Sequence, residues 1–454
     1  MARLQALARE ELQARVGPQA DLLSIERAAQ AIGREMWGGA LSAELQQRCA
    51  AQPAGHCRHC GGRLRLVEAH RPLQLPVVVG PLQCERPYYV CRAWGRGTAL
   101  SDEALAVGRA AWTPALQAAA ACLGVEAPFA EAAAALTEAL GIPVPTEDVR
   151  RTTEALGMVA EAEEQARIAE VERGQEQPGT APVDSETLLV TLDGCAVHAD
   201  GAWHEAKVGS VSTLGPDRAP ACESERSALR LGPQRYCVGV CEDAERFWQR
   251  LYALAVAWGL GGRRIRRVVV VADGAPWIWN RVEPFLALSG VEVVQIVDLW
   301  HARQRIWEVA HAVFGEEGAQ ARQWAEPLCL ALAQAGPDPV LRALSEVPAR
   351  TEAACHCVAN VRAYFQQHAA RMDYPRFAAA GLPLGSGTVE SACKLVVAAR
   401  EKQAGMRWSR PGAQAVATLR ALKRSGRWEA FWASRPQQRR PPVRTLPGSG
   451  ASAA

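Results

Sequence analysis

The stretch LLVTLDG at residues 188–194 decides the fold class of this chain. It is a short apolar run of high β propensity that ends in Asp193 and a glycine. The same design recurs in VVVVADG at residues 268–274, where four consecutive valines lead to Asp273. Short, continuous apolar runs of this kind are typical of strands in a buried sheet. The two stretches therefore predict a buried sheet with one carboxylate at the C-terminal end of each strand.

The segments around these two strands follow a recognisable order of elements. We expect strands at 188–192, 196–198, 203–208 and 236–240, a helix at 244–258, a strand at 268–272, a helix after Pro276, a strand at 291–297 and a helix at 299–313. A three-strand meander followed by alternating helices and strands is the order of an α/β ribonuclease-H-like core. Residues 315–381 read as entirely helical, and we interpret them as an all-α insertion into that core.

A third carboxylate follows this insertion. In LGSGTVESACK at residues 384–394, a Gly-Ser-Gly turn precedes a helix that presents Glu390 in its first turn, with Ser386 or Thr388 as the expected N-cap. In the predicted fold this helix packs beside the first and fourth strands, so its carboxylate is expected to converge with the two aspartates. Three such oxygen ligands suit two Mg²⁺ or Mn²⁺ ions, which would activate a hydroxyl for phosphoryl transfer. Each acid alone is commonly only a turn residue or a helix-dipole partner.

Residues 55–98 have the pattern of a zinc ribbon. The knuckle formed by Cys57 and Cys60 is followed by glycines, a β-prone stretch and then Cys91. Thiolates at such spacings are typical Zn²⁺ ligands. A complete ribbon would carry a fourth cysteine at position 94, where this chain has Trp94. The sequence therefore predicts the ribbon shape and leaves two alternatives open, a ribbon that binds Zn²⁺ and one that folds on its core alone.

Residues 129–152 have the pattern of a helix-turn-helix. An Ala/Leu-rich helix ends at Gly141, and Thr146 is expected to cap a short second helix that exposes Arg150 and Arg151. A separate charged helix is expected after it. Exposed arginines on the second helix suit contacts with DNA, although any helical hairpin can show this pattern.

Net charge and cysteine content give only limited information about the partners and the cellular compartment of this protein. The 454 residues predict two to four domains, and the net charge of +3 identifies no partner. Residues 406–444 carry ten arginines and lysines against the single acid Glu429, which is typical of a surface that meets a polyanion or of a solubilising tail. The fourteen cysteines show no disulfide spacing, and no apolar run fits a signal peptide or a membrane span. We therefore expect reduced cysteines, a cytoplasmic location and no membrane partner.

Six motifs together resemble the ISKra group of bacterial insertion-sequence transposases, which belong to the DDE class. They are TLDG at 191–194, EAKVG at 205–209, VADGAPWIW at 271–279, VDLWHA at 297–302, GSGTVES at 385–391 and KQAGMRWS at 402–409. The resemblance covers nearly the whole chain. It implies that Asp193, Asp273 and Glu390 are catalytic acids that hold two metal ions. It also implies an enzyme that binds the terminal inverted repeats of a mobile element, cuts its ends and joins them to target DNA.

Asp298 and His301 resemble the Asp-x-x-His motif of Mutator-like transposases. At this spacing the two side chains share one side of a helix. His301 is therefore expected to orient the scissile phosphate or to protonate a leaving oxygen. The alternative is that Asp298 caps the helix and that His301 is structural.

The chain after the third carboxylate is expected to face DNA. Lys394, Lys402 and Arg407 supply positive charge for phosphates. Trp408 is expected either to stack on a base or to pack under the helix. Glu401 replaces the aromatic residue of the resembling family, and its negative charge would oppose phosphate binding.

The resemblance implies a homo-oligomer, a dimer or larger, because both element ends must be brought together. Two other functions stay open: a metal-dependent ribonuclease-H-like nuclease without strand transfer, and an inactive, transposase-derived DNA-binding protein. The expected domains are an N-terminal helical region (1–54), a zinc-ribbon-like module (55–98), a helix-turn-helix-like domain (99–173), a linker (174–185), the first part of the core (186–314), the insertion (315–381), the core helix with the basic region (382–434) and a disordered tail (435–454).

Overall fold

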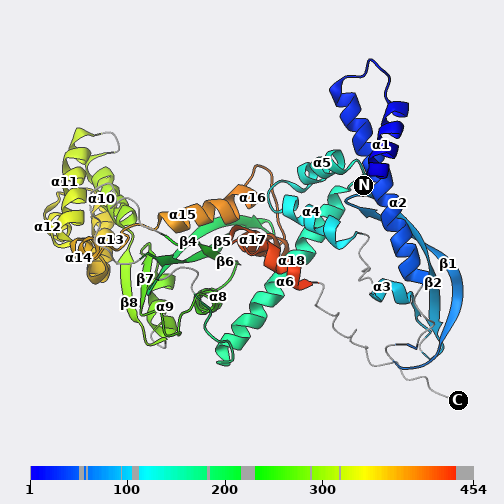
Figure 1. The fold of residues 1–454 in the computed structure, drawn as a ribbon. Coiled ribbons are helices and arrows are strands. Elements are labelled where there is room, and N and C mark those ends of the chain that lie inside the picture. Colours follow the sequence, from blue (N-terminus) through cyan, green and yellow to red (C-terminus); the bar gives the residue numbers. More distant parts are fainter. Residues whose placement is uncertain are drawn as a thin grey trace. The chain divides into compact units, whose positions relative to one another are not determined.

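Two separate sheets and a long series of helices make up this chain in a computed structural model (Figure 1). The chain divides into two units, one of Met1–Thr153 with Ala430–Ala454 and the other of Glu154–Glu429. Within the part of the chain that is described, no helix has the length and apolar character needed to cross a membrane. The expected tail lies outside the described residues from position 436 onward. The structure describes residues 2–50, 56–57, 60–93, 95–104, 112–180, 185–215, 231–286, 289–315 and 318–435.

In the first unit, helix α2 packs against an antiparallel sheet of order β1-β2-β3. Buried side chains of Cys49, Leu73, Val77, Leu82 and Cys84 form the core beneath this helix. Gly80 turns the β1–β2 hairpin with φ +128°, and a Cβ there would lie 2.6 Å from the carbonyl oxygen of Arg34, so only glycine fits. The elements are α1 (Ala2–Arg15), α2 (Leu22–Ala50), β1 (Leu64–Val77), β2 (Gly80–Cys91), β3 (Gly97–Thr98) and α3 (Leu100–Ala104).

Helices α4 (Pro114–Gly124) and α5 (Phe129–Leu140) pack with the start of α6 (Thr146–Glu172) around a small apolar core. As expected, α5 ends at Gly141, which has the left-handed φ of 62°. The expected short second helix and the separate charged helix are wrong, because α6 is one continuous helix. The glycine in the middle of α6, Gly157, does not break it but lets another helix approach. A Cβ at Gly157 would lie 2.2 Å from the carbonyl oxygen of Ala415.

The second unit contains a five-stranded sheet of order β6-β5-β4-β7-β8. Strand β5 runs antiparallel to both of its neighbours, while β7 and β8 run parallel to β4. The mixed α/β class predicted from the sequence is confirmed. The strands are β4 (Thr187–Ala199), β5 (Ala202–Leu214), β6 (Arg235–Val240), β7 (Arg267–Ala272) and β8 (Glu292–Val297).

One expectation about the first strand is wrong. The segments 188–192 and 196–198 are not two strands but parts of the single strand β4. Pairing of β4 with β7 stops at Leu192, whereas pairing with β5 continues to Ala199. Asp193 therefore lies where the parallel neighbour ends, not where its own strand ends.

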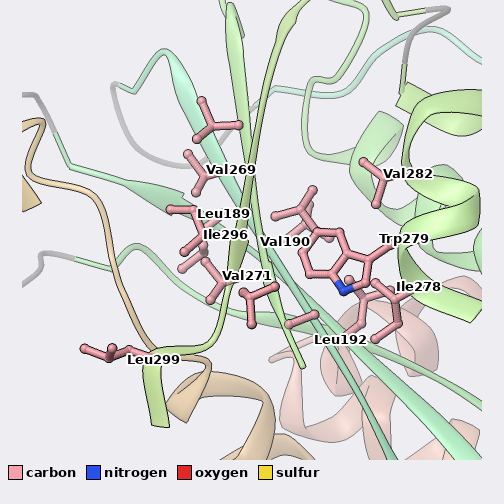
Figure 2. Close-up of a cluster of buried hydrophobic side chains, with 14 of the residues drawn as sticks. Leu189, Val190, Leu192, Val269, Val271, Ile278, Trp279, Val282, Ile296 and Leu299 are labelled. Atoms are coloured by element: carbon pink, nitrogen blue, oxygen red, sulfur yellow. The ribbon is translucent and has the colours of Figure 1, made fainter. Parts of the chain in front are cut away.

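Helices cover both faces of this sheet. Ile278, Trp279 and Val282 of α9 lie against the Val190 face, and Leu299 lies on the side of Leu189, Val269, Val271 and Ile296 (Figure 2). Each such fully buried aliphatic side chain contributes about 1.5–3 kcal/mol to the free energy of unfolding. The helices of this unit after α6 are α8 (Ala244–Ala257), α9 (Pro276–Leu286), α10 (Leu299–Phe314), α11 (Ala319–Ala335), α12 (Asp338–Glu346), α13 (Glu352–His368), the short η2 (Ala369–Arg371), α14 (Tyr374–Ala379), α15 (Gly387–Ala392), the π-helical η3 (Cys393–Ala398), α16 (Ala399–Glu401), α17 (Arg410–Arg424) and the start of α18 (Trp428–Ser434).

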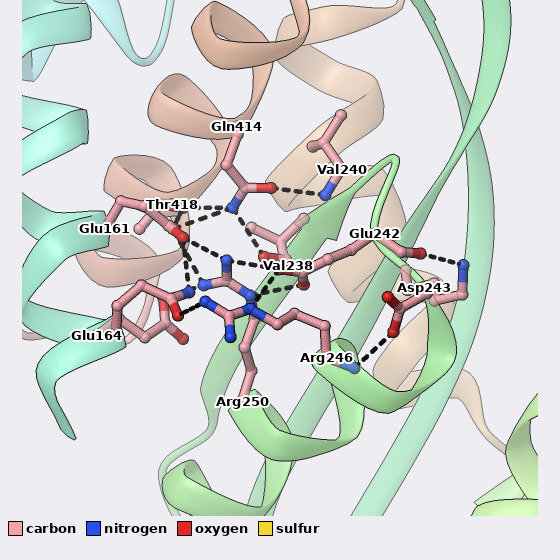
Figure 3. A network of polar contacts seen from close by, with 12 residues as sticks. Glu161, Glu164, Val238, Val240, Glu242, Asp243, Arg246, Arg250, Gln414 and Thr418 are labelled. Atoms are coloured by element: carbon pink, nitrogen blue, oxygen red, sulfur yellow. Dashed lines mark hydrogen bonds and ion pairs between the residues drawn. The ribbon is translucent and has the colours of Figure 1, made fainter. Parts of the chain in front are cut away.

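A buried arginine joins three of these helices (Figure 3). Arg250 of α8 is 2% exposed and meets carboxylates from α6 and from the loop before α8. Its Nη1 lies 3.0 Å from Glu161 Oε2 and 3.1 Å from Glu164 Oε2, and its Nε lies 2.7 Å from Glu242 Oε2. Thr418 of α17 donates to Glu161 at 3.0 Å, so α17 belongs to the same network.

Candidate active site

Asp193 and Asp273 lie side by side on neighbouring strands. The last paired residues of β4 and β7 are Leu192 and Ala272, and each aspartate directly follows one of them. Neighbouring strands are about 4.8 Å apart, and residues in register point to the same face. Burial raises the pKa of Asp193 above its ordinary value, and the negative charge of Asp273 raises it further, although a hydrogen bond from the Gly194 N–H opposes both. A bound cation would relieve this clustering of negative charge.

A third aspartate, Asp298, continues the row onto β8. Ala272 pairs with Val297, so Asp298 is the next residue at the same level of the sheet. Its side chain is completely buried. Oδ1 accepts the backbone N–H groups of Trp300 at 2.6 Å and His301 at 3.0 Å, and thereby caps α10.

The second oxygen of Asp298 reaches the turn that precedes α15. Oδ2 accepts hydrogen bonds from the backbone N–H of Ser386 and from its hydroxyl, the latter at 2.6 Å. Burial alone would raise the pKa of Asp298, but the hydrogen bonds from His301 and Ser386 outweigh it and lower the pKa to about 2. Asp298 is therefore a stable anion in the interior.

Helix α15 brings Glu390 to the same face of the sheet. Thr388 Oγ1 lies 3.0 Å from Thr191 Oγ1 of β4, and the neighbouring Val389 is buried. As expected, Ser386 is the N-cap residue of α15, but no side-chain hydrogen bond caps the helix. The two hydroxyls instead contact Asp298 and Thr191, respectively.

His301 completes the cluster from the first turn of α10. Ligand atoms of Asp298, His301 and Glu390 all lie within 4.8 Å of one another. Nδ1 of His301 lies 3.5 Å from Asp298 Oδ1. The interaction with Asp298 raises the pKa of His301 against the effect of burial, and Asp273 and Asp193 raise it further. His301 thus binds its proton more strongly than an isolated imidazole does.

The three predicted acids, Asp193, Asp273 and Glu390, interact electrostatically but do not form a single group within 4.8 Å. Ligands divided between two ions can be wider apart, since the ions of such a pair are themselves roughly 3.5–4 Å from each other. Among the described residues, no lysine or arginine forms an ion pair with any of the three. Asp193 and Asp273 are partly buried and Glu390 is exposed. Carboxylates without a lysine or arginine partner fit a hard divalent cation such as Mg²⁺ or Mn²⁺.

Two tyrosines of the helical insertion contact the chain at, or just after, the C-terminal ends of β7 and β8. The ring of Tyr364 covers Gly274, where a Cβ would lie 2.0 Å from its Cε2 atom, so the residue after Asp273 must be glycine. Tyr374 donates a hydrogen bond of 3.0 Å to the Val297 carbonyl. Neither tyrosine belongs to a sequence motif, so sequence reasoning missed both. The Gly-Ser-Gly pattern around Ser386 is recognisable in the sequence, but its hydrogen bond to Asp298 is not.

A sequence model of an uncharacterised protein family, UPF0236, matches residues 62–432 of the chain. The chain belongs to this family. The match includes the candidate site. No curated protein matches the chain.

In this UPF0236 member, the side chains expected to bind DNA differ in exposure. Lys394, Lys402 and Arg407 are exposed. Trp408 is only 9% exposed, and its indole Nε1 donates to the Glu401 carbonyl at 3.2 Å. The assignment of Trp408 to DNA stacking is therefore wrong, and the alternative role in packing holds. Glu401 is buried as well, so the expected negative charge on the DNA-facing surface is also wrong.

Arg150 and Arg151 lie near the start of α6 on exposed positions of the first unit. Both contact Glu147, with N···O distances of 2.6 Å and 2.8 Å. The hydrogen bond from Arg150 is the main reason that the pKa of Glu147 falls to about 2. Their positive charge is thus partly balanced by Glu147.

The cysteines of the ribbon-like module converge. The sulfur atoms of Cys57, Cys60 and Cys91 lie within 4.8 Å of one another, and those of Cys60 and Cys91 are 3.4 Å apart. Two turns in this module share one hydrogen-bond pattern. The Cys57 N–H donates to the Gly62 carbonyl and the Gly61 N–H to Cys57, and in the same way Cys91 donates to Arg96 and Gly95 to Cys91. By sequence count, position 94 matches Cys60, but Trp94 lies outside the described residues.

Proposed function

We propose that this UPF0236 member is a DNA transposase of the DDE class that uses divalent metal ions. The observation that carries the proposal is the convergence of three elements on one face of a sheet: Asp193 and Asp273 on neighbouring strands, and Glu390 on a helix that returns after an insertion. The strand order β6-β5-β4-β7-β8, with β5 antiparallel to the rest, supports a ribonuclease-H-like core.

In the proposed reaction, Asp193, Asp273 and Glu390 would hold the metal ions. Two bound Mg²⁺ or Mn²⁺ ions would supply an activated nucleophile and stabilise the leaving oxygen. Water first attacks a phosphorus atom at the element end, which breaks the P–O3′ bond and leaves a 3′-hydroxyl. That hydroxyl then attacks a phosphorus atom of target DNA and displaces another 3′ oxygen. His301, whose pKa is raised by Asp298, would donate a proton to the departing oxygen.

The remaining parts of the chain fit DNA binding. Lys394, Lys402 and Arg407 follow the third acid on exposed positions and suit phosphate contacts. In the first unit, the ribbon-like module and the α5–α6 hairpin with Arg150 and Arg151 would recognise the terminal inverted repeats. The three clustered thiols fit Zn²⁺ as a structural ion there. Joining two ends requires at least two copies of the chain, so a dimer or larger assembly forms on DNA.

The decisive substitution is Asp193→Asn. We expect it to lower cleavage of a plasmid that carries the element ends by at least about 100-fold, because metal-ion catalysis supplies several kcal/mol. DNA binding in metal-free buffer should stay within about twofold, since the substitution removes one carboxylate and no cation. Asp200→Asn is the matched control, because Asp200 is an exposed aspartate at the tip of the same hairpin, paired with Arg410.

The same assay separates the alternatives. Cleavage without joining of precut 3′-hydroxyl ends would identify a ribonuclease-H-like nuclease that lacks strand transfer. Specific end binding without cleavage in Mg²⁺ or Mn²⁺ would identify an inactive DNA-binding protein. Undiminished cleavage by Asp193→Asn would show that the catalytic assignment is wrong.

A further inference from the structure

We infer that Asp298 is a positioning residue, which holds Glu390 in the site by fastening together the two chain segments that flank the helical insertion. The inference rests on the proposed function, because it concerns the residues that would hold the metal ions. It gives Asp298 a role distinct from those of Asp193 and Asp273, although all three occupy the same row of the sheet.

The two chain segments that flank the insertion, α10 and residues 382–386, meet at Asp298. The chain leaves the sheet through α10, which begins directly after Asp298, and it returns at residues 382–386. Leu299 N–H donates to the Leu384 carbonyl at 2.9 Å, directly beside the two hydrogen bonds from Ser386 to Asp298. Residues 88 positions apart in the sequence are thus fixed to one carboxylate.

Fixing Ser386 also fixes Glu390. The Ser386 carbonyl accepts the N–H groups of Val389 at 2.8 Å and Glu390 at 3.2 Å, so the first turn of α15 starts at this residue. Ser386 is itself only 1% exposed. A hydrogen bond to a charged group is stronger than one between neutral groups, and a buried N–H left without its acceptor is destabilising. Displacement of this turn would therefore move the third acid relative to the two aspartates.

Asp298 does not itself serve as a metal ligand. Its two oxygens already accept four hydrogen bonds, from Trp300, His301 and the two groups of Ser386. An ionised carboxylate offers about four acceptor positions, so little capacity is left for an ion. The nearness of Asp298 to His301 and Glu390 thus reflects support for the site.

Asp298→Asn tests this role selectively. The amide oxygen can still accept the two N–H groups of α10, but the amide nitrogen cannot accept the two hydrogen bonds from Ser386. We expect Mn²⁺ binding, measured by calorimetry or by electron paramagnetic resonance without DNA, to weaken about 10–100-fold. The Mg²⁺ concentration for half-maximal cleavage should rise by a similar factor. Metal-free DNA binding should stay within about twofold.

Two further variants are compared with Asp298→Asn, one at the partner residue and one as a control. Ser386→Ala removes one of the two hydrogen bonds from this turn and leaves the cap of α10 intact, so it should weaken Mn²⁺ binding in the same direction but less. Asp243→Asn is the control, because Asp243 caps α8 through the Arg246 N–H and contacts no part of α15 among the described interactions. It should leave Mn²⁺ binding unchanged.

The outcomes distinguish this inference from the proposed function. If the unmodified protein binds no Mn²⁺, or if Asp193→Asn leaves its binding unchanged, the proposed metal site is wrong and this inference fails with it. If Mn²⁺ binding depends on Asp193 but is unaffected by both Asp298→Asn and Ser386→Ala, only the positioning role is overturned. A lowered melting temperature with unchanged Mn²⁺ affinity of the folded protein would likewise overturn it.

Discussion

At the scale of single residues, the same side chain has different properties according to its neighbours. Asp193 and Asp298 lie in one row at the ends of paired strand segments. Burial raises the pKa of Asp193, whereas hydrogen bonds lower that of Asp298 to about 2. Glu401 is a third case. Burial raises its pKa well above the ordinary value, against the effect of Arg400, and its carboxylate oxygens have no hydrogen-bond partner among the described residues.

Glu401→Gln is therefore expected to leave DNA affinity within about twofold, because a buried group adds no charge to the surface. Its neighbour Lys402 is exposed and provides the comparison. Lys402→Gln should weaken binding and reduce the slope of log K against log salt by about 1. Fluorescence anisotropy with a short DNA duplex over a range of salt concentrations measures both. A large gain in DNA affinity for Glu401→Gln would show that the negative charge of Glu401 does oppose phosphate binding, as the sequence suggested.

The same substitution has a pH-dependent effect on stability. Because the pKa of Glu401 is raised in the folded state, the unfolded chain loses its proton first as the pH rises above 4.5. The free energy of unfolding of the wild-type protein should then fall by up to about 1.4 kcal/mol per pH unit from this group until the folded pKa is reached. The Glu401→Gln variant has no titrating carboxyl group at this position, so its free energy of unfolding should not fall for this reason. Urea denaturation at several pH values should show that the stability of the variant relative to the wild type increases as the pH rises above 4.5. Below pH 4.5 this relative stability should not change with pH.

At the scale of elements, the ribbon-like module combines two similar turns with three clustered thiols. Each turn closes with the same pair of backbone hydrogen bonds and a glycine of positive φ, Gly61 at 67° and Gly95 at 64°. Structural Zn²⁺ sites have four ligands, and here the fourth position of the pattern is Trp94.

Trp94→Cys is expected to complete the set of thiolates and to raise the affinity for Zn²⁺ at least about tenfold, since zinc affinity follows ligand identity and number. Transfer of Zn²⁺ to a coloured chelator measures the change. Cys91→Ser should lower the affinity, and Cys84→Ser is the control, because buried Cys84 lies outside the cluster. Equal affinity in the wild type and in Trp94→Cys would argue against zinc in this module.

At the scale of the whole molecule, stability in the Glu154–Glu429 unit depends on a buried charge as well as on the apolar core. Arg250 balances Glu161, Glu164 and Glu242, and the network includes helices α6, α8 and α17 (Figure 3). Burial alone would lower the pKa of Arg250, but the hydrogen bonds that it donates to Glu242 and Glu161, together with the negative charge of Glu164, raise it well above its ordinary value. The arginine is therefore always charged.

Arg250→Ala should lower the free energy of unfolding by about 3–5 kcal/mol, because it leaves three carboxylates that are only 16–22% exposed without their partner. Arg246→Ala on the same helix is the control. Its side chain is 50% exposed, its Nε lies 3.9 Å from Glu242 Oε1, and its Nη2 donates to the side-chain amide oxygen of Gln165, so its effect should stay within about 1 kcal/mol. Urea denaturation followed by circular dichroism measures both variants. Similar losses for the two would show that the network does not hold the helices together.

The sequence by itself determined the local features of this protein. Apolar runs specified strands β7 and β8, helical periodicity specified the insertion, and turn residues placed Glu390 in the first turn of a helix. These features are local, because strand and helix formation depend on residues close in the sequence. The sequence also indicated Asp193 and Asp273, since each acid directly follows an apolar run.

Only the tertiary structure decided which distant residues meet. The continuation of β4 beyond Asp193 depends on its pairing with β5, and the burial of Glu401 and Trp408 depends on how the last helices pack. The link from Asp298 to Ser386 crosses the whole insertion. No local pattern encodes such contacts, because they arise when segments separated by many residues compete for the same buried surface and hydrogen-bond partners.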